Sequence, residues 1–339
     1  MKKMLIALAS IAAWAAAAPA QAESAAEFYK GKTVEYYTPG SAGGGYDTYL
    51  RTMIPYLEKE TGAKFLPINE AGGGHLLAIN KVFSAKQDGL SLVFADGEAA
   101  LLGELFDLPG ARYDLLKANW IARVNAETRM ILFTPGSPYK TIQEAAKGDK
   151  LIKFGSTGKS DATSMASTTA SEALGLKTKI VTGYKGSREF VRAAVQGEVD
   201  AISLSESSSA RYAKGNKLRA VVALDHERSH FFPDVPTVFE AFKLDPAHAW
   251  WIDFQAAFAK VGRSVLTGPG VPADRVAYLR AVFKKVLADP ELKAALEKRD
   301  APITYAPAED VAKYTHNVLG SLTPEKKKEV RHVMLEKYF

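Results

Sequence analysis

Short β-rich runs alternate with amphipathic helical stretches over most of this chain, and this alternation limits the folds that it can adopt. Residues 33–38 are typical of a strand, and residues 46–60 of a helix with its apolar side chains on one face. Strands that alternate with helices form parallel sheets covered by helices on both faces. In such sheets a ligand binds beyond the carboxyl ends of the strands, where the strand order reverses.

The same pattern continues to residue 224, and the rest of the chain is mainly helical. Further strands are expected at residues 65–68, 91–95, 129–134, 151–154, 179–182, 200–204 and 219–224. Further helices are expected at residues 76–85, 99–106, 142–147, 163–174, 187–196, 206–213, 273–288, 290–298, 308–319 and 324–336. Pro55 lies inside the 46–60 helix and should kink it. Since a single core rarely grows beyond about 250 residues, a chain of 339 residues should form two domains.

The first residues have the features of a secretory signal peptide. Lys2 and Lys3 precede an uncharged apolar run from Met4 to Ala18, and Ala20-Gln-Ala22 is a typical cleavage site. The run is shorter than the roughly 20 residues that span a bilayer. We therefore expect cleavage after Ala22 and a mature chain that is not inserted in the membrane.

The composition excludes several classes of protein. The chain has no cysteine, hence no disulfide, thiolate metal site or lipoprotein anchor. Its formal net charge of +6 is spread along the sequence, without the basic blocks of a nucleic-acid binder. No cofactor, bound metal or nucleic-acid partner is predicted.

Three glycine-rich loops each join a strand to a helix. They are PGSAGGGYD at 39–47, NEAGGGH at 69–75 and FGSTGKSD at 154–161. Glycine lets a ligand approach the main chain, and the first-turn N–H groups of a helix have no intrahelical partner. Such a helix start favours a carboxylate or phosphate. Asp47 and Asp161 follow two of the loops, and their simplest role is to cap or orient them.

Two motifs suggest other functions, and neither fits fully. The loop at 154–161 resembles a nucleotide-binding P-loop, but Lys153 stands where that motif needs glycine. His226-Glu-Arg-Ser-His230 matches a zinc-protease pattern, but Pro233 and Pro236 prevent the helix that would hold the metal. No G-x-S-x-G elbow frames any serine, which disfavours a serine hydrolase.

An ordered set of segments resembles the solute receptors of tripartite tricarboxylate transporters, the Bug-type periplasmic binding proteins. The segments are TPGSAGGGYDTYLR from Thr38, NEAGGGHLLAINKVFSAKQDGLSLVFA from Asn69, SPYKTIQE from Ser137, FGSTGKSDATSMASTTASEALG from Phe154, GYKGSREFVRAAVQGEVDAI from Gly183, PDVPTVFEA from Pro233 and GPGVPADRVAYLRAVFKKVLADPELKAAL from Gly268. Ser164 stands where the family usually has histidine, and residues 250–267 are longer than the family's corresponding turn.

The resemblance implies two doubly wound α/β domains with a ligand cleft between them, as in type II periplasmic binding proteins. Domain 1 would comprise residues 23–127 and 250–339, and domain 2 residues 128–249. Loops from both domains would contact the ligand through backbone amides, hydroxyls and waters. The implied ligand-binding residues are Gly40, Ser41, Ala42, Gly43, Gly44, Tyr46, Asp47, Gly73, His75, Asp96, Gly97, Ser156, Thr157, Gly158, Ser160, Ser164, Tyr184, Lys185, Gly186 and Ser205.

The implied function is a non-enzymatic, monomeric periplasmic receptor that delivers a small organic acid to membrane permease subunits. A sensing partner of a membrane kinase is an alternative, and a secreted hydrolase is a weaker one. The ligand class stays open between aliphatic di- or tricarboxylates and aromatic acids. Aromatic acids would be favoured if Tyr46, His75, Tyr184, Trp250 and Trp251 lined the pocket.

Overall fold

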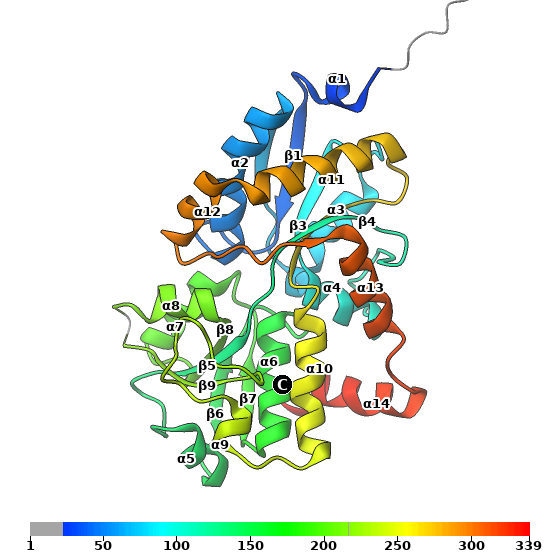
Figure 1. The fold of residues 1–339 in the computed structure, drawn as a ribbon. Coiled ribbons are helices and arrows are strands. Elements are labelled where there is room, and N and C mark those ends of the chain that lie inside the picture. The colour runs from blue at the N-terminus through cyan, green and yellow to red at the C-terminus, as the bar shows by residue number, and fades with distance from the viewer. Residues whose placement is uncertain (1–22, 216) are drawn as a thin grey trace, which may run out of the picture.

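Two β-sheets, each packed against helices, form the two lobes of the protein (Figure 1). The structure, a computed structural model, describes residues 23–215 and 217–339. The predicted signal peptide, residues 1–22, lies outside the described residues. We call the lobe built on the six-stranded sheet the first lobe and the lobe built on the five-stranded sheet the second lobe.

The sheet of the first lobe has the order β11-β4-β10-β3-β1-β2. Strands β1, β2 and β3 are parallel, and β10 runs antiparallel to both of its neighbours. In chain order the strands are β1 (Thr33–Thr38), β2 (Lys64–Asn69), β3 (Ser91–Asp96), β4 (Asn119–Asn125), β10 (Arg263–Thr267) and β11 (Ala306–Pro307).

The sheet of the second lobe has the order β7-β6-β8-β5-β9, and here β5 is the antiparallel strand. In chain order the strands are β5 (Arg129–Phe133), β6 (Ile152–Gly155), β7 (Thr178–Val181), β8 (Ala201–Ser205) and β9 (Arg219–Ala223). Each lobe is therefore an α/β unit, as the alternating pattern predicts. The predicted parallel sheets are wrong in part, because β10 and β5 enter them as antiparallel strands after the chain has crossed from the other lobe.

The chain crosses between the lobes just before β5, just before β10 and again at residues 320–323, between α13 and α14. One crossing, residues 126–128, joins β4 to β5, and another, residues 260–262, precedes β10. These two crossings lie side by side, because Arg263 pairs with Asn125 in the β10–β4 ladder. They are placed to act as a hinge between the lobes.

The helices distribute over both lobes. Those that contact first-lobe elements are α1 (Ala25–Tyr29), α2 (Gly45–Thr61), η1 (Gly73–His75), α3 (Leu76–Ser84), α4 (Gly97–Leu105), α11 (Ala273–Ala288), α12 (Pro290–Glu297) and α13 (Ala308–Leu319). Those that lie in the second lobe are α5 (Ile142–Lys147), α6 (Ala162–Leu174), α7 (Ser187–Val195), α8 (Glu206–Ala213), α9 (Val238–Ala241), α10 (Pro246–Ala259), α14 (Pro324–His332) and η2 (Val333–Lys337) (Figure 1).

Helix α2 shows how the apolar pattern becomes packing. Tyr49, Leu50, Met53 and Leu57 are buried against β1, β2 and α11, as their spacing predicts. Burying each such side chain contributes about 1.5–3 kcal/mol. The helix continues unbroken through Pro55 to Gly62, whose left-handed backbone ends it.

Several elements were not predicted from the sequence. Residues 119–125 form β4, and residues 250–267, which the family resemblance left without an account, form most of α10 and all of β10. Helix α10 packs along α6 of the second lobe, as does η2 near the C-terminus. The strands fall on either side of the predicted domain boundaries, but α10 straddles residue 250, and the boundaries stay a prediction.

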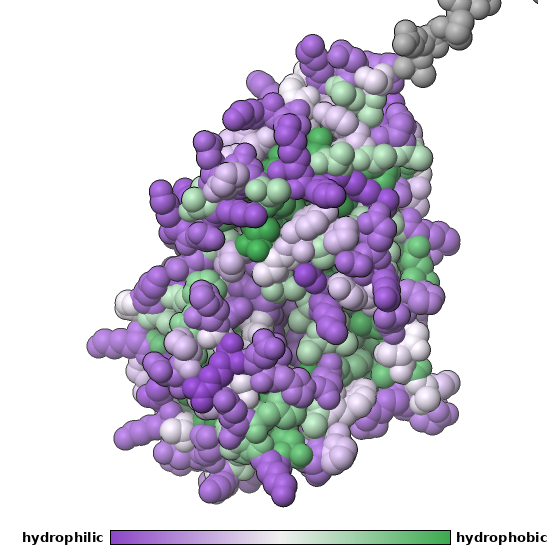
Figure 2. Space-filling model, in the orientation of Figure 1, coloured by the Kyte–Doolittle hydropathy of each residue, from purple (hydrophilic) through white to green (hydrophobic). Residues whose placement is uncertain are grey.

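Polar side chains cover most of the face shown in Figure 2, with smaller apolar areas between them. In the described ranges 23–215 and 217–339, no helix combines the length and the apolar character that a bilayer span needs.

Candidate functional site

A cavity lies between the two lobes, where loops that follow strands of both sheets meet. Its volume is about 40 Å³, and since a water molecule needs roughly 10–15 Å³ of such space, it has room for only about three waters. The lobes are thus closed onto one another. The cavity is lined by Pro39, Gly40, Ser41, Gly44, Gly45, Tyr46, His75, Asp96, Arg129, Thr157, Ala162, Thr163, Gly186, Ser187, Phe190, Leu204, Ser205, Ser208 and Arg263.

Four helices start at this cavity. Gly45 begins α2, Ala162 begins α6, Ser187 begins α7 and Ser205 is the N-cap of α8, and all four residues line it. The first-turn N–H groups of a helix lack intrahelical acceptors and carry the positive end of the helix dipole. Their convergence favours an anion in the cavity.

The start of α2 is open to an external acceptor. Its N-cap, Gly44, has no side chain that could accept a hydrogen bond from the first turn. Asp47 takes the Gly43 N–H at 2.8 Å and the Arg51 Nε–H at 2.8 Å, on the side of the loop away from the cavity. The predicted orienting role of Asp47 is confirmed, and the α2 amides are left for a ligand.

The start of α6 is already occupied by a carboxylate of the chain itself. Asp161 is the N-cap and accepts N–H groups from Ser164 at 2.6 Å, Thr157 at 2.9 Å and Gly158 at 3.3 Å. Its predicted capping role is confirmed. The Thr157 and Gly158 amides, however, are engaged by Asp161 and are not free to bind a ligand, although Thr157 lines the cavity.

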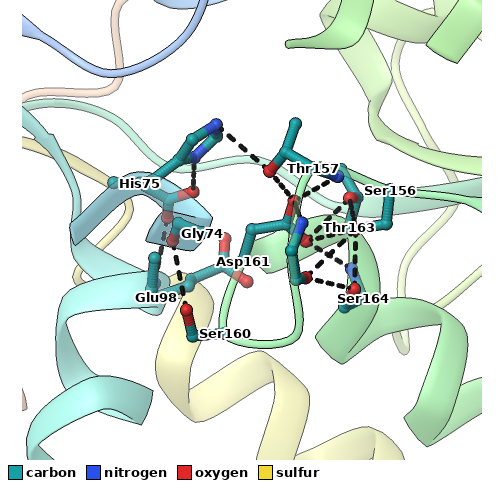
Figure 3. A network of polar contacts seen from close by, with 12 residues as sticks. Gly74, His75, Glu98, Ser156, Thr157, Ser160, Asp161, Thr163 and Ser164 are labelled. Atoms are coloured by element: carbon teal, nitrogen blue, oxygen red, sulfur yellow. Dashed lines mark hydrogen bonds and ion pairs between the residues drawn. The ribbon is translucent and has the colours of Figure 1, made fainter. Parts of the chain in front are cut away.

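A closed hydroxyl network lies under the same loop (Figure 3). Ser156 Oγ is 2.6 Å from Ser164 Oγ and 2.8 Å from Thr163 Oγ1, and it donates to Asp161 at 2.8 Å. Ser164 Oγ donates to the Gly158 carbonyl at 2.6 Å. Ser156 and Ser164 are fully buried, so this network fixes the loop and leaves their hydroxyls no direct access to the cavity.

Two glycines allow the loops of the lobes to touch. A Cβ on Gly158 would lie 2.7 Å from Gly74 Cα, and one on Gly186 would lie 2.9 Å from the Ser41 nitrogen. Neither distance is tolerable, so glycine is needed at both positions for this close approach. Ser160, predicted as a ligand contact, instead donates to the Gly74 carbonyl across the same contact at 3.2 Å.

His75 and Asp96 form a buried pair at the first-lobe side of the cavity. His75 Nδ1 lies 2.8 Å from Asp96 Oδ2, and its Nε2 faces Thr157 Oγ1 of the second lobe at 3.5 Å (Figure 3). Burial alone would lower the pKa of His75, but the hydrogen bond and charge of Asp96 raise that pKa above its ordinary value. Burial opposes ionisation of Asp96, yet His75 and Arg129 hold the pKa of Asp96 below its usual range. The pair is therefore ionic.

Two buried arginines line the cavity and were not predicted from the sequence. Arg129 begins β5 and pairs with Glu98 of α4, whereas Arg263 begins β10 and pairs with Glu127. Arg263 also donates to Ser205 Oγ of the second lobe at 2.8 Å. In the sequence, each arginine is the first residue of a buried strand, RMILF or RSVLT. A charged residue at the start of such a strand is the signal that could have indicated both positions.

The structure brings part of the predicted site together. The predicted residues that line the cavity are Gly40, Ser41, Gly44, Tyr46, His75, Asp96, Thr157, Gly186 and Ser205. Those outside its lining are Ala42, Gly43, Asp47, Gly73, Gly97, Ser156, Gly158, Ser160, Ser164, Tyr184 and Lys185. The lining residues that were missed are Pro39, Gly45, Arg129, Ala162, Thr163, Ser187, Phe190, Leu204, Ser208 and Arg263.

The excluded residues have local reasons for their positions. Ala42, Gly43, Gly73 and Lys185 are exposed on the outer sides of their loops. Gly97 donates its N–H to the Gly262 carbonyl at 2.8 Å, at the second crossing.

Of the aromatic residues proposed to line the pocket, only Tyr46 and His75 do so. Tyr184 points to Glu198 at 3.3 Å on the second lobe. Trp250 stacks on Phe254 with ring centroids 4.9 Å apart, and Trp251 is buried in the same α10 core. Both tryptophans therefore hold α10 in place and are remote from the cavity lining.

The zinc-protease pattern has an ordinary structural role. His226 Nε2 pairs with Asp253 at 2.7 Å, and its ring stacks on Phe239 at 4.0 Å. In the part of the chain that the structure describes, no three histidine or acidic residues are grouped to hold a metal ion.

Comparison with known proteins gives one family. A family model described as the tripartite tricarboxylate transporter family receptor matches residues 51–324. A protein of Cupriavidus necator, the UPF0065 protein in the gbd 5′ region, is 25% identical over 319 residues, which cover 91% of this chain and 90% of that protein.

Solved structures share the fold. The periplasmic binding protein BugD superposes with a TM-score of 0.74 at 20% identity, over 91% of this chain and 100% of that one. MatC from Rhodopseudomonas palustris, solved with bound malate, gives a TM-score of 0.72 at 20% identity, over 88% of this chain and 98% of that one.

Proposed function

The chain belongs to the tripartite tricarboxylate transporter receptor family, and on this premise we propose that it is a periplasmic receptor that captures a small organic acid between its lobes and delivers it to a membrane permease. The observation that carries the proposal is the convergence of four helix starts on one cavity between the lobes.

Helix starts of this kind bind negative oxygen without any net charge on the protein side. Each contributes about 0.3–1 kcal/mol when exposed and up to ~2 kcal/mol when partly buried. At α2 the glycine N-cap leaves this potential available, whereas Asp161 already occupies the start of α6 and Glu127 accepts the Ser207 N–H at the start of α8. We therefore assign the ligand's carboxylate to the start of α2, close to Tyr46 and facing Gly186 and Ser187 of the second lobe.

Capture requires the lobes to separate. A cavity of about 40 Å³ is too small for an organic acid, so the ligand enters when the loops around Gly74–Gly158 and Ser41–Gly186 part. The adjacent crossings at 126–128 and 260–262 are the segments about which such a motion would turn, in the manner of hinge closure around a ligand. The ligand class fits that of MatC, which was solved with malate.

The Thr157–His75–Asp96 arrangement has the order of a hydrolytic triad, but its hydrogen bonding favours binding. The Thr157 hydroxyl donates to Asp161, so its proton is directed away from His75. The 3.5 Å separation from His75 Nε2 is also longer than an activated nucleophile requires. We assign these residues to loop contact between the lobes, and no catalytic role is proposed.

A thermal-shift screen tests the receptor function. Malate, succinate, citrate and benzoate would be added to the purified chain beginning at Glu23, with neutral sugars as controls. A ligand at about 100 times its dissociation constant adds about 2.7 kcal/mol of stability. At least one carboxylate should raise the melting temperature while the sugars do not. A shift with sugars and with none of the acids would contradict the proposal, as would hydrolysis of p-nitrophenyl acetate by His75-dependent catalysis.

A further inference from the structure

Arg129 lies both at the cavity between the lobes and next to the crossing at 126–128. It is the first residue of β5, directly after the crossing at 126–128, and it lines the cavity although only 9% of its surface is exposed. A buried guanidinium must find hydrogen-bond acceptors to replace water. The partners of Arg129 therefore show what its remaining donors are free to do.

Among the described residues, the protein hydrogen-bonds one donor atom of this guanidinium. Nη2 donates to Glu98 Oε1, and the other oxygen of Glu98 accepts from Gln255 Nε2 at 2.6 Å. Nε of Arg129 is buried and has no hydrogen-bond partner among the described residues. An unpaired buried donor is unfavourable unless something else supplies the acceptor.

Arg263 provides the contrast within the same cavity. Its Nη1 donates to Asn125 Oδ1 at 3.0 Å and to Glu127, and its Nη2 donates to Ser205 Oγ. Its guanidinium also lies 5.3 Å and 5.0 Å from the ring centroids of Tyr46 and Tyr49. Arg263 is thus held by the protein from several sides, whereas Arg129 has an N–H donor that no described residue accepts.

The charges around Arg129 support a role toward an anion. His75 and Asp96 line the same cavity as an ionic pair and offset each other. Glu98 neutralises Arg129 in the present arrangement, although burial raises the pKa of Glu98 and so works against its ionised form. A planar guanidinium can hold one carboxylate along each of two edges.

We propose that Arg129 is a ligand-binding, specificity-determining residue, which holds an anionic oxygen of the ligand through the guanidinium N–H donors that Glu98 does not use. This inference rests on the proposed receptor function and adds a side-chain cation to the helix-start amides. Because α2 belongs to the first lobe and Arg129 to β5 of the second, a ligand held by both would stabilise the closed arrangement.

Paired substitutions test the inference by calorimetric titration with whichever of malate, succinate, citrate and benzoate the wild type binds most tightly. Arg129→Lys removes the fork but keeps the charge, and it should weaken binding about tenfold to a hundredfold. Glu98→Gln removes the charge that neutralises Arg129 and keeps a hydrogen-bond acceptor, and binding should be retained or strengthened. Arg263→Lys serves as the matched control for loss of a buried arginine fork, measured by ligand-free melting temperature.

The outcomes separate the two proposals. If Arg129→Lys binds as tightly as wild type, or if Glu98→Gln weakens binding as much as Arg129→Lys does, Arg129 is a structural ion-pair partner and the inference is wrong while the receptor function stands. If wild type binds none of the four acids, the receptor function fails, and this inference fails with it. Arg129→Gln, measured only if it melts as wild type does, should bind more weakly still.

Discussion

The charge on His75 is set by Asp96, its partner in the cavity wall. If burial acted alone, the imidazole of His75 would be neutral, and an uncharged ring would face Thr157 of the second lobe. Because Asp96 raises the pKa of His75, the contribution of the His75 charge to folding is fully present below about pH 6.5, the ordinary histidine value, as long as Asp96 stays ionised. That stabilisation is lost as the pH rises through the higher folded-state pKa.

Asp96→Asn should therefore reverse the direction of the His75 shift. In the wild type, the imidazole NMR signals of His75 should titrate above about 6.5, and in the variant below it, because burial is then the dominant influence. A His75 titration that is unchanged by the substitution would show that Asp96 does not set its charge.

Asp161 offers a second test at the residue scale. It accepts three main-chain N–H groups and three hydroxyls under the third glycine loop. Losing an N-cap costs about 0.5–2 kcal/mol, and Asp161→Ala should exceed the lower end because it also leaves buried hydroxyls unpaired. Asp161→Asn keeps an acceptor and should lose less. Urea unfolding measures both, and an alanine variant as stable as wild type would contradict this account of the loop.

Among single residues, the sequence predicts the glycine turns and the two capping aspartates well, because both depend on local backbone geometry. It does not predict Arg129 and Arg263, whose importance depends on which strands meet at the crossings. It also cannot distinguish a hydroxyl that faces the cavity, such as Thr157, from one that faces the network below, such as Ser164.

At the scale of elements, most strands are predicted, and two important ones are not. The run at 91–96 is apolar and fully buried, so its pattern is plain. β4 and β10 carry Asn119, Arg123 and Arg263. These polar residues interrupt the apolar pattern, so hydrophobicity alone does not predict the two strands. These polar residues have structural partners, such as Asn119 Nδ2 with the Gly268 carbonyl at 2.7 Å.

The C-terminal elements are likewise held by contacts with parts of the chain that are distant in sequence. Met334 of η2 is fully buried, and its sulfur accepts a hydrogen bond from Thr168 of α6 at 3.0 Å. Met334→Ala should lower the free energy of unfolding by about 2–5 kcal/mol. Lys337→Ala, which removes a partly exposed ion pair with Glu172, should cost no more than about 1 kcal/mol. Equal effects in chemical denaturation would show that η2 does not form part of the second-lobe core.

At the scale of the whole molecule, the two lobes meet at the cavity and are joined by the two adjacent crossings. The helix starts at the cavity belong to different lobes: α2 to the first, and α6, α7 and α8 to the second. An anion between them is therefore held best when the lobes are closed. The contribution of the second lobe differs from the expectation, since the predicted amides of the third loop are engaged by Asp161. The first-turn amides of α8 are engaged by Thr128 and Glu127, so the start of α7 is the second-lobe helix start left for a ligand.

A crystal structure of the protein with the tightest-binding carboxylate is the most direct test of this account. We predict a carboxylate oxygen within hydrogen-bonding distance of the first-turn amides of α2, with second-lobe contacts from Gly186, Ser187 or Arg129. A ligand bound away from these residues, for example in the groove between α2 and α12, would contradict the account.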